Sequence, residues 1–236
     1  MLRRLVGLAA LAISACPAPA LACKGPHLLF SDNFATVDRT WNFDPDTAAL
    51  TNIGAGPVTP EGGKMKVKPP SQGAGWSRFY RGVFVRDADI CVNIRSPNNL
   101  ISPDQTSAGL LFWNENQGWY LYFSFNPKGD ANLWEHYEEV RQGHDGTKTL
   151  STNWANKLSW PSVPGAGRGA SLTNTLRVTM KGDTLTLYVN DQSRSIKFTD
   201  GAPDSGTQFG LRVVSENAEI STWKFSRLRV TDLTPE

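Results

Sequence analysis

Residues 175–190, with the sequence TLRVTMKGDTLTLYVN, decide the fold of this chain. Apolar and polar residues alternate on both sides of Lys181-Gly182-Asp183, and a period of two is that of a strand with one buried face. A glycine-containing turn between two such runs predicts an antiparallel hairpin. Asn190-Asp191-Gln192 is a second turn, and it predicts another hairpin with residues 193–198. Three consecutive antiparallel strands are therefore expected here.

The same alternation recurs along most of the chain, and no window has a 3.6-residue period over three turns. The other expected strands are residues 28–34, 64–68, 78–85, 88–95, 108–114, 119–125, 132–138, 209–215 and 221–231. About a dozen short strands separated by turn residues are typical of an antiparallel sandwich of two sheets. No linker divides the chain, so we predict an all-β fold with one sandwich domain over residues 23–236.

Residues 142–170 are the longest stretch in which we expect no strand. The stretch is rich in glycine and contains Trp154 and Trp160. We interpret it as a long loop, and loops of this length in compact domains often have a function.

The first 22 residues have the pattern of a secretory signal peptide. Two arginines precede an apolar run over residues 5–15, and Ala20-Leu21-Ala22 offers a cleavage site after Ala22. A buried N-terminal helix is one alternative, and lipidation of Cys16 in Ile13-Ser14-Ala15-Cys16 is another. The signal predicts a periplasmic or secreted protein.

Composition and charge narrow the range of functions. The 236 residues are 39% hydrophobic and 19% charged, which is the composition of a globular protein rather than a disordered one. The full chain has 24 Lys+Arg and 22 Asp+Glu, and removal of the two signal arginines leaves 22 of each. A neutral mature chain without basic runs is not expected to bind nucleic acid. No transmembrane segment is expected after removal of the signal.

Cys23 and Cys91 are the two cysteines that remain after cleavage behind Ala22. An even pair in an oxidising compartment predicts a disulfide, and two free thiols are the alternative. Two cysteines separated by 68 residues do not suggest a zinc site.

Several motifs resemble bacterial secreted concanavalin A-like domains, the laminin G-like jelly rolls that include the 3-keto-disaccharide hydrolase-like group. The motifs are residues 30–34 (FSDNF), 107–112 (SAGLLF) with 118–123 (GWYLYF), 174–190, 209–211 (FGL) and 223–230 (WKFSRLRV). The resemblance spans residues 28–233 and implies a concanavalin A-like jelly-roll sandwich. It implies little about activity, because this fold hosts lectins, glycosidases and adhesion modules. Jelly rolls of this type often hold calcium between the first and last strands, which would make Asp32 and Asp232 the candidate ligands; no other cofactor is expected.

Candidate catalytic residues are few. The related laminarinase-like enzymes carry E-x-D-x-x-E on one strand, and this sequence lacks that motif. Glu135 and Glu139 would lie about 13 Å apart along a strand, too far for a paired-carboxylate mechanism. Glu115 or Glu135 acting with His136 as a base remains a candidate arrangement, and a solvated strand face is the alternative.

Aromatic residues from three successive expected strands suggest a binding surface. They are Trp113, Tyr120, Tyr122, Trp134 and His136. In each strand they alternate with aliphatic residues, so we expect them on the face of one sheet that points away from the core. Sugar rings stack on such side chains, while Asn114, Glu115 and Glu135 could bind hydroxyl groups. Packing of these rings between the sheets is the alternative.

We therefore predict a secreted protein that binds carbohydrate or another cell-envelope ligand without catalysis, through the aromatic face and residues 142–170. A glycoside-processing enzyme of the keto-disaccharide type is one alternative. A structural envelope protein is the other.

Overall fold

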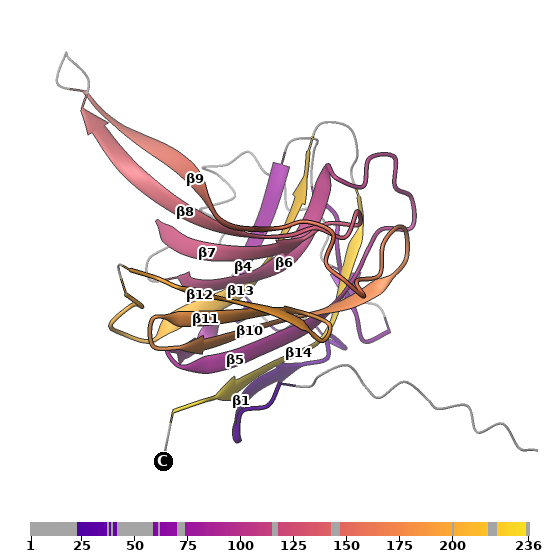
Figure 1. Ribbon diagram of the computed structural model, residues 1–236, viewed down its shortest axis with the longest axis horizontal. Coiled ribbons are helices and arrows are strands. Elements are labelled where there is room, and N and C mark those ends of the chain that lie inside the picture. The colour runs from indigo at the N-terminus through magenta and orange to yellow at the C-terminus, as the bar shows by residue number, and fades with distance from the viewer. Residues whose placement is uncertain are drawn as a thin grey trace, which may run out of the picture.

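Two antiparallel sheets stack face to face in the computed structural model (Figure 1). The structure describes residues 23–36, 38, 40–41, 59–60, 62–69, 74–114, 118–142, 147–199, 201–216 and 221–234. The predicted signal peptide lies outside these ranges. The strands are β1 (His27–Asp32), β2 (Thr59–Pro60), β3 (Met65–Val67), β4 (Ala74–Val85), β5 (Ala88–Arg95), β6 (Thr106–Asn114), β7 (Trp119–Phe125), β8 (Ala131–Gln142), β9 (Lys148–Trp160), β10 (Thr173–Lys181), β11 (Thr184–Val189), β12 (Gln192–Lys197), β13 (Thr207–Ser215) and β14 (Trp223–Asp232).

The predicted all-β jelly-roll sandwich is confirmed. One sheet has eight strands in the order β12-β11-β10-β5-β14-β3-β2, with β1 also paired to β14. The other has six strands in the order β4-β13-β6-β7-β8-β9. No helix in the described part of the chain is long and apolar enough to cross a membrane.

The hairpin that decides the fold forms as predicted. β10 and β11 pair from Leu176↔Val189 to Lys181↔Thr184. Gly182 in the turn has a φ of 53°, a conformation that costs glycine little and other residues more. The turn then leads into β12, which pairs along β11.

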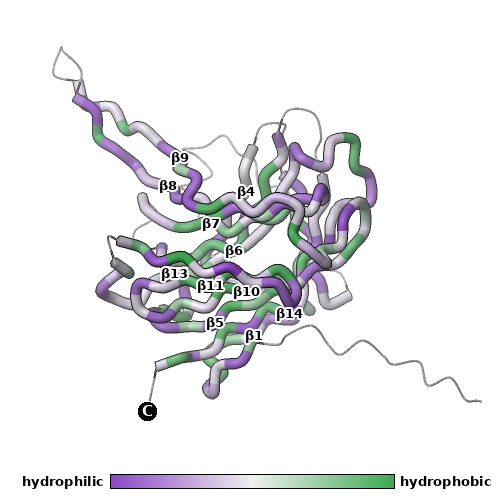
Figure 2. The backbone as a smooth tube through the Cα atoms, in the orientation of Figure 1, coloured by the Kyte–Doolittle hydropathy of each residue, from purple (hydrophilic) through white to green (hydrophobic). Residues whose placement is uncertain are grey.

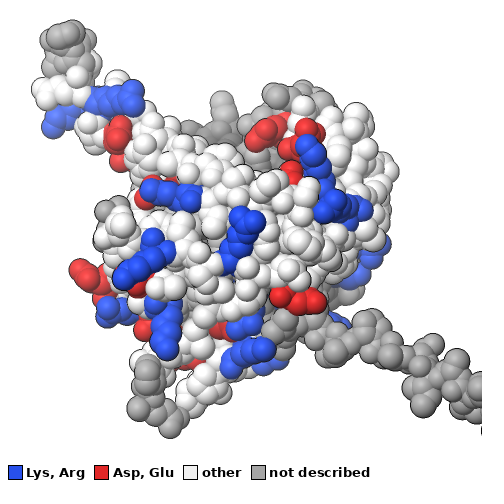
Figure 3. All heavy atoms as spheres, viewed as in Figure 1, with Lys and Arg blue, Asp and Glu red and all other residues white. Residues whose placement is uncertain are grey.

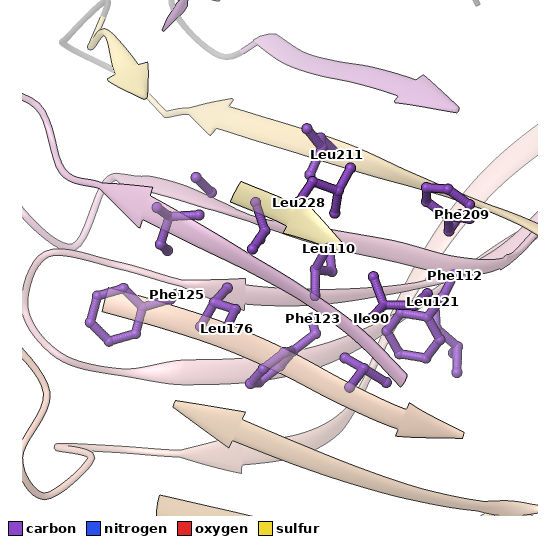
Figure 4. Packing of buried hydrophobic residues seen from close by; sticks show 14 of the residues in the cluster. Ile90, Leu110, Phe112, Leu121, Phe123, Phe125, Leu176, Phe209, Leu211 and Leu228 are labelled. Atoms are coloured by element: carbon purple, nitrogen blue, oxygen red, sulfur yellow. The ribbon is translucent and has the colours of Figure 1, made fainter. Parts of the chain in front are cut away.

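The core lies between the sheets and is built from side chains that alternate along most strands. Figure 4 shows inward-pointing side chains from both sheets meeting in this layer, among them Leu110 and Phe123, which are register partners on β6 and β7. Both are fully buried. Burial of side chains of this size stabilises the fold by about 1.5–3 kcal/mol each. Figure 2 shows the hydrophobic stretches concentrated in the body of the sandwich.

The predicted loop over residues 142–170 is wrong for much of its length. Residues 148–160 form β9, the edge strand of the six-stranded sheet, which pairs with β8 from Ala131↔Trp160 to Gln142↔Lys148. Most side chains of β9 are exposed or half-buried on both faces, so its sequence lacks the apolar alternation by which strands are recognised. Its pairing is supplied by β8, not by its own hydrophobicity.

The distal halves of β8 and β9 project from the body of the sandwich as an arm (Figure 1). Figure 2 shows the arm as mostly hydrophilic, and Figure 3 shows charges of both signs on it. Val140 and Leu150 pair across the arm and are 66% and 63% exposed.

The predicted Cys23–Cys91 disulfide is present, with Cα atoms 5.7 Å apart. Closing a loop of this length stabilises the chain by about 4 kcal/mol in the chain-entropy account. The bond fixes residues 23–25 on the outer face of the eight-stranded sheet. There the backbone amide of Lys24 donates to Asp89 at 2.9 Å, and Asp89 accepts both of the bonds donated by Arg177 Nε, at 2.7 and 2.9 Å.

The expected calcium pair does not come together. β1 and β14 are antiparallel, so Asp32 lies opposite Leu228 while Asp232 lies opposite His27, at the other end of the pair. That offset amounts to about 17 Å along the strands, too far for one cation. Asp32 instead accepts hydrogen bonds from the amide of Phe34 and from Trp41 Nε1. The calcium site predicted from this pair is therefore wrong. The described residues contain no group of three or more His, Cys, Asp or Glu side chains that could hold a metal ion.

Candidate functional site

Trp113 does not lie on the predicted outer face. A β-bulge between Gln208 and Gly210 sets two residues of β6, Phe112 and Trp113, against one residue of β13. Trp113 has a φ of 56°, which turns its side chain into the core, where it is 1% exposed. Its predicted orientation is therefore wrong, because a bulge breaks the alternation from which that orientation was inferred.

Tyr120, Tyr122, Trp134 and His136 do lie on the outer face of the six-stranded sheet. Tyr120 pairs with His136 and Tyr122 with Trp134 across β7 and β8. Tyr120 and Tyr122 belong to a second apolar cluster, separate from the core, against which Trp134 packs. The two tyrosines and His136 are nonetheless buried, at 6%, 3% and 6% exposure, while Trp134 is half-buried.

Trp154 and Arg212 cover this cluster from opposite parts of the sheet. The Trp154 ring stands edge-on to Tyr120, Tyr122 and His136, with centroids 5.9, 6.4 and 4.8 Å away. The Arg212 guanidinium carbon lies 4.7 Å from the centre of the Trp154 ring and 5.6 Å from that of Tyr122. These contacts explain how tyrosines outside the core become buried.

The contact between Trp154 and Arg212 shows that the six-stranded sheet is curled. Trp154 is on β9 and Arg212 is on β13, with β6, β7 and β8 between them. In a flat sheet their backbones would be about 19 Å apart and their side chains would stand parallel. The observed 4.7 Å separation requires the outer face to fold inwards on itself.

A pocket of about 290 Å³ opens on this face beside the Trp154–Arg212 contact. Its lining combines two tryptophan rings with small polar side chains and three charged ones. The lining residues are Asp104, Ser107, Tyr122, Ser124, Asn126, Asn132, Trp134, Trp154, Arg212, Val214 and Glu216. Flat rings beside amide, hydroxyl and charged groups can hold a ligand that has both apolar faces and hydroxyl groups.

The titratable groups under the rings are held in their neutral forms. Burial raises the pKa of Tyr122 to about 12, and its hydroxyl lies 3.2 Å from Ser107 Oγ. Burial, assisted by the charge of Arg212, lowers the pKa of His136 to about 4. His136 stacks on Tyr120 at 4.3 Å, and its buried Nδ1 has no hydrogen-bond partner among the described residues. The neutral imidazole of His136 thus packs beneath Trp154, one of the residues that line the pocket.

The candidate catalytic pair of Glu135 and His136 does not converge. Adjacent residues of a strand point to opposite faces, and the Glu135 carboxylate accepts a bond from Trp119 Nε1 at 2.8 Å. It also pairs with Lys157 Nζ at 2.7 Å. Glu135 therefore has partners of its own away from the pocket. Glu115 lies outside the described residues.

Sequence reasoning missed Arg212 and assigned Trp154 to a loop. No local pattern marks Arg212, since an arginine alternating with apolar residues is ordinary on a solvated strand face. Its position became meaningful only when the curled sheet placed it against rings from β7 and β9.

A larger hollow of about 740 Å³ lies beside β1 and β14. Its lining includes Asp32, Asp38, Arg227 and Arg229. Asp38 accepts hydrogen bonds from the amide of Thr40 at 2.8 Å and from the Tyr80 hydroxyl at 3.2 Å. Because both carboxylates already have partners within the chain, the pocket on the six-stranded sheet is the better candidate site.

No protein-family model and no curated protein sequence matches the chain. Solved structures do resemble it. The catalytic domain of an endo-1,3-β-glucanase (laminarinase) from Thermotoga petrophila RKU-1 has a TM-score of 0.59 and 12% identity, over 90% of this chain and 99% of that one. A protein of unknown function with a galectin-like fold from Bacillus subtilis has a TM-score of 0.56 and 10% identity, over 89% and 98%.

A third similar structure is the Crh5 transglycosylase in complex with NAG, with a TM-score of 0.52 and 9% identity over 92% of this chain and 89% of that one. At these identities the likeness concerns the fold. The chain thus has the concanavalin A/galectin-like β-sandwich fold, which is shared by glycoside hydrolases and transglycosylases.

Proposed function

We propose that this protein binds carbohydrate without catalysis, in the pocket on the outer face of the six-stranded sheet. The observation that carries the proposal is the pairing of Trp134 and Trp154 with amide and hydroxyl side chains around one pocket. The C–H faces of a sugar ring pack on indole rings, and its hydroxyl groups need hydrogen-bonding partners at the edges.

Both the tryptophan rings and the polar side chains of the pocket are positioned to contact a ligand. Trp154 is 39% exposed and Trp134 is half-buried, so both rings have surface left for a ligand. Asn126, Asn132 and Ser124 come from neighbouring positions on β7, β8 and the turn between them. The similar structures, which include a 1,3-β-glucanase and a transglycosylase, make a glycan a reasonable ligand class.

Glycoside processing is the second candidate function, because two carboxylates line the same pocket. Asp104 and Glu216 are neighbours in space, since the amide of Glu216 donates to the carbonyl of Gln105. Paired carboxylates are what glycosidases use. This pair replaces the Glu135–His136 arrangement expected for an enzyme of the keto-disaccharide type.

We also propose that the protein acts in the periplasm or outside the cell. The predicted signal peptide is the basis for this, and the Cys23–Cys91 disulfide supports it because disulfides persist in oxidising compartments.

Isothermal titration with a panel of soluble glycans tests the binding proposal. Wild-type protein should bind at least one glycan, and Trp134→Ala and Trp154→Ala should each lower the affinity about 10-fold or more, the range of one lost stacking contact. Phe84→Ala is the control, because Phe84 is 59% exposed and does not line the pocket. It should leave the affinity unchanged.

The same incubations distinguish the two functions. Release of new reducing ends that is abolished by Glu216→Gln would favour the enzyme. Binding without product supports the proposal as stated. Absence of binding to every glycan would overturn it and would favour the structural envelope protein.

A further inference from the structure

Arg212 is half-buried and stacked on aromatic rings, and unlike Arg177 it has no acidic partner among the described residues. Among the described residues, no carboxylate lies within 4.0 Å of its guanidinium nitrogens. Arg177, by contrast, is paired with Asp89 at 2.7 Å. A charge that is partly removed from water without a counter-charge costs free energy, so its retention calls for an explanation.

The position of Arg212 is closely defined. Its Nη1 donates to Ser77 Oγ, and its guanidinium packs against the rings of Trp154 and Tyr122. Its Nε is buried and has no hydrogen-bond partner among the described residues. Gly75 on β4 provides the space, because a Cβ atom there would lie 2.3 Å from Arg212 Nη2. The guanidinium is thus held in place while its charge stays uncompensated.

The pocket is also electrically polarised. Arg212 and the two tryptophans line one part of it. Glu216 also lines the pocket and lies four residues further along the chain, so the Cα atoms of Arg212 and Glu216 are about 14 Å apart by strand geometry. Asp104 lines the same end as Glu216, since its neighbour Gln105 accepts a bond from the Glu216 amide. A ligand that fits this arrangement carries an anionic group at the arginine end and neutral hydroxyl groups at the acidic end.

We propose that the glycan bound in this pocket is acidic, with a carboxylate or sulfate group that pairs with Arg212. The inference rests on the proposed function, and it names the class of carbohydrate. An anionic group supplies the counter-charge that the chain itself does not provide, and arginine forms strong charge-assisted hydrogen bonds with such groups.

Isothermal titration with matched polysaccharides tests this without any variant. Polygalacturonate and its fully methyl-esterified form have the same backbone but differ in charge, and chondroitin sulfate and desulfated chondroitin provide the sulfate comparison. We expect at least one charged member to bind about 10-fold more tightly than its neutralised form, the loss typical of one charge-assisted hydrogen bond. The first pair identifies carboxylate and the second identifies sulfate as the group recognised.

Arg212→Gln should remove this discrimination, so that the charged and neutral forms bind within about two-fold of each other. Arg194→Gln is the matched control, because Arg194 also stacks on a tryptophan, with its guanidinium carbon 5.1 Å from the Trp160 ring, but does not line the pocket. It should leave the discrimination intact. The wild-type comparison stands even if Arg212→Gln does not fold.

Equal affinity of wild type for charged and neutral forms, with Trp154→Ala still weakening both, would overturn the acidic-glycan inference while leaving the proposed function in place. Discrimination that survives in Arg212→Gln would also overturn it, because another residue would then recognise the anionic group of the glycan. Failure of every glycan in both sets and in the neutral panel would overturn the proposed function together with this inference.

Discussion

Each outer face of the sandwich holds an arginine that stacks on an aromatic ring, but the surroundings of the two arginines differ. On the eight-stranded sheet, Arg177 stacks on Tyr188 at 4.5 Å and pairs with Asp89, beneath residues fixed by the disulfide. On the six-stranded sheet, Arg212 stacks on Trp154 at 4.7 Å, yet no described carboxylate pairs with it. Both guanidinium groups stack on aromatic rings, but Arg177 is buried and paired with a carboxylate, whereas Arg212 is half-buried and has no carboxylate partner among the described residues.

That difference separates a structural arginine from one available to a ligand. Asp89 is fully buried and accepts bonds from Arg177 and from the amide of Lys24, so the charge of Arg177 is compensated by the chain itself. The face around Arg212 keeps a pocket and buried polar atoms without partners. Stability is therefore expected to depend on the first face, and binding on the second.

The largest expected effect on stability comes from removing the carboxylate that pairs with Arg177. Asp89→Asn leaves the Arg177 charge buried without compensation, which should lower the free energy of unfolding by about 3–5 kcal/mol. Arg212→Gln should lower it by about 1 kcal/mol, because a half-buried side chain loses its contacts with two rings and one hydrogen bond. Urea unfolding of both variants measures the two values. Equal losses would show that the two arginines do not differ in role.

A pH effect of intermediate size should come from His136. Its pKa falls from 6.5 to about 4 in the folded protein, chiefly because burial disfavours its charged form. The neutral form stabilises the fold above pH 6.5, and this contribution is lost as the pH falls towards 4, by about 2–3 kcal/mol.

Unfolding free energies at pH 7 and pH 4.5 test the His136 effect. The decrease between the two pH values should be smaller in His136→Gln than in wild type, because only the shared carboxylate contributions remain. Equal decreases would mean that His136 titrates normally and that the cover formed by Trp154 and Arg212 is open.

The smallest effect on stability is expected from Gly75→Ala, which should nevertheless weaken ligand binding. The new methyl group would meet the end of the flexible Arg212 side chain, so the guanidinium can move away at a cost below about 1 kcal/mol. Binding of acidic glycans should weaken while thermal unfolding stays near that of wild type. Gly206→Ala, where the nearest atom would be Phe84 Cβ at 3.2 Å, is the control away from the pocket. Unchanged binding in Gly75→Ala would argue against a fixed position for Arg212.

The sandwich could be predicted from the sequence because apolar and polar residues alternate within most of its strands. The hairpin over residues 175–190 and the buried strands β5 and β7 follow that rule. β9 does not, since its register comes from β8 and most of its side chains are exposed or half-buried. The disulfide followed from cysteine parity and compartment, which do not depend on geometry.

The candidate site could be predicted only in part. Tyr120, Tyr122, Trp134 and His136 share the expected face because alternation holds along β7 and β8. Trp113 departs from it at a bulge, and a bulge depends on how two distant strands meet. The contact between Trp154 and Arg212 depends on the curl of the whole sheet, which no local pattern encodes.

The most direct test of the central claim, that carbohydrate binds on the outer face of the six-stranded sheet, is a ¹H–¹⁵N NMR titration of the tryptophan indole N–H signals. Addition of a glycan that binds should shift the signals of Trp134 and Trp154, which line the pocket, while those of the buried Trp76 and Trp223 stay in place. Saturable binding that leaves the Trp134 and Trp154 signals unmoved would contradict the account.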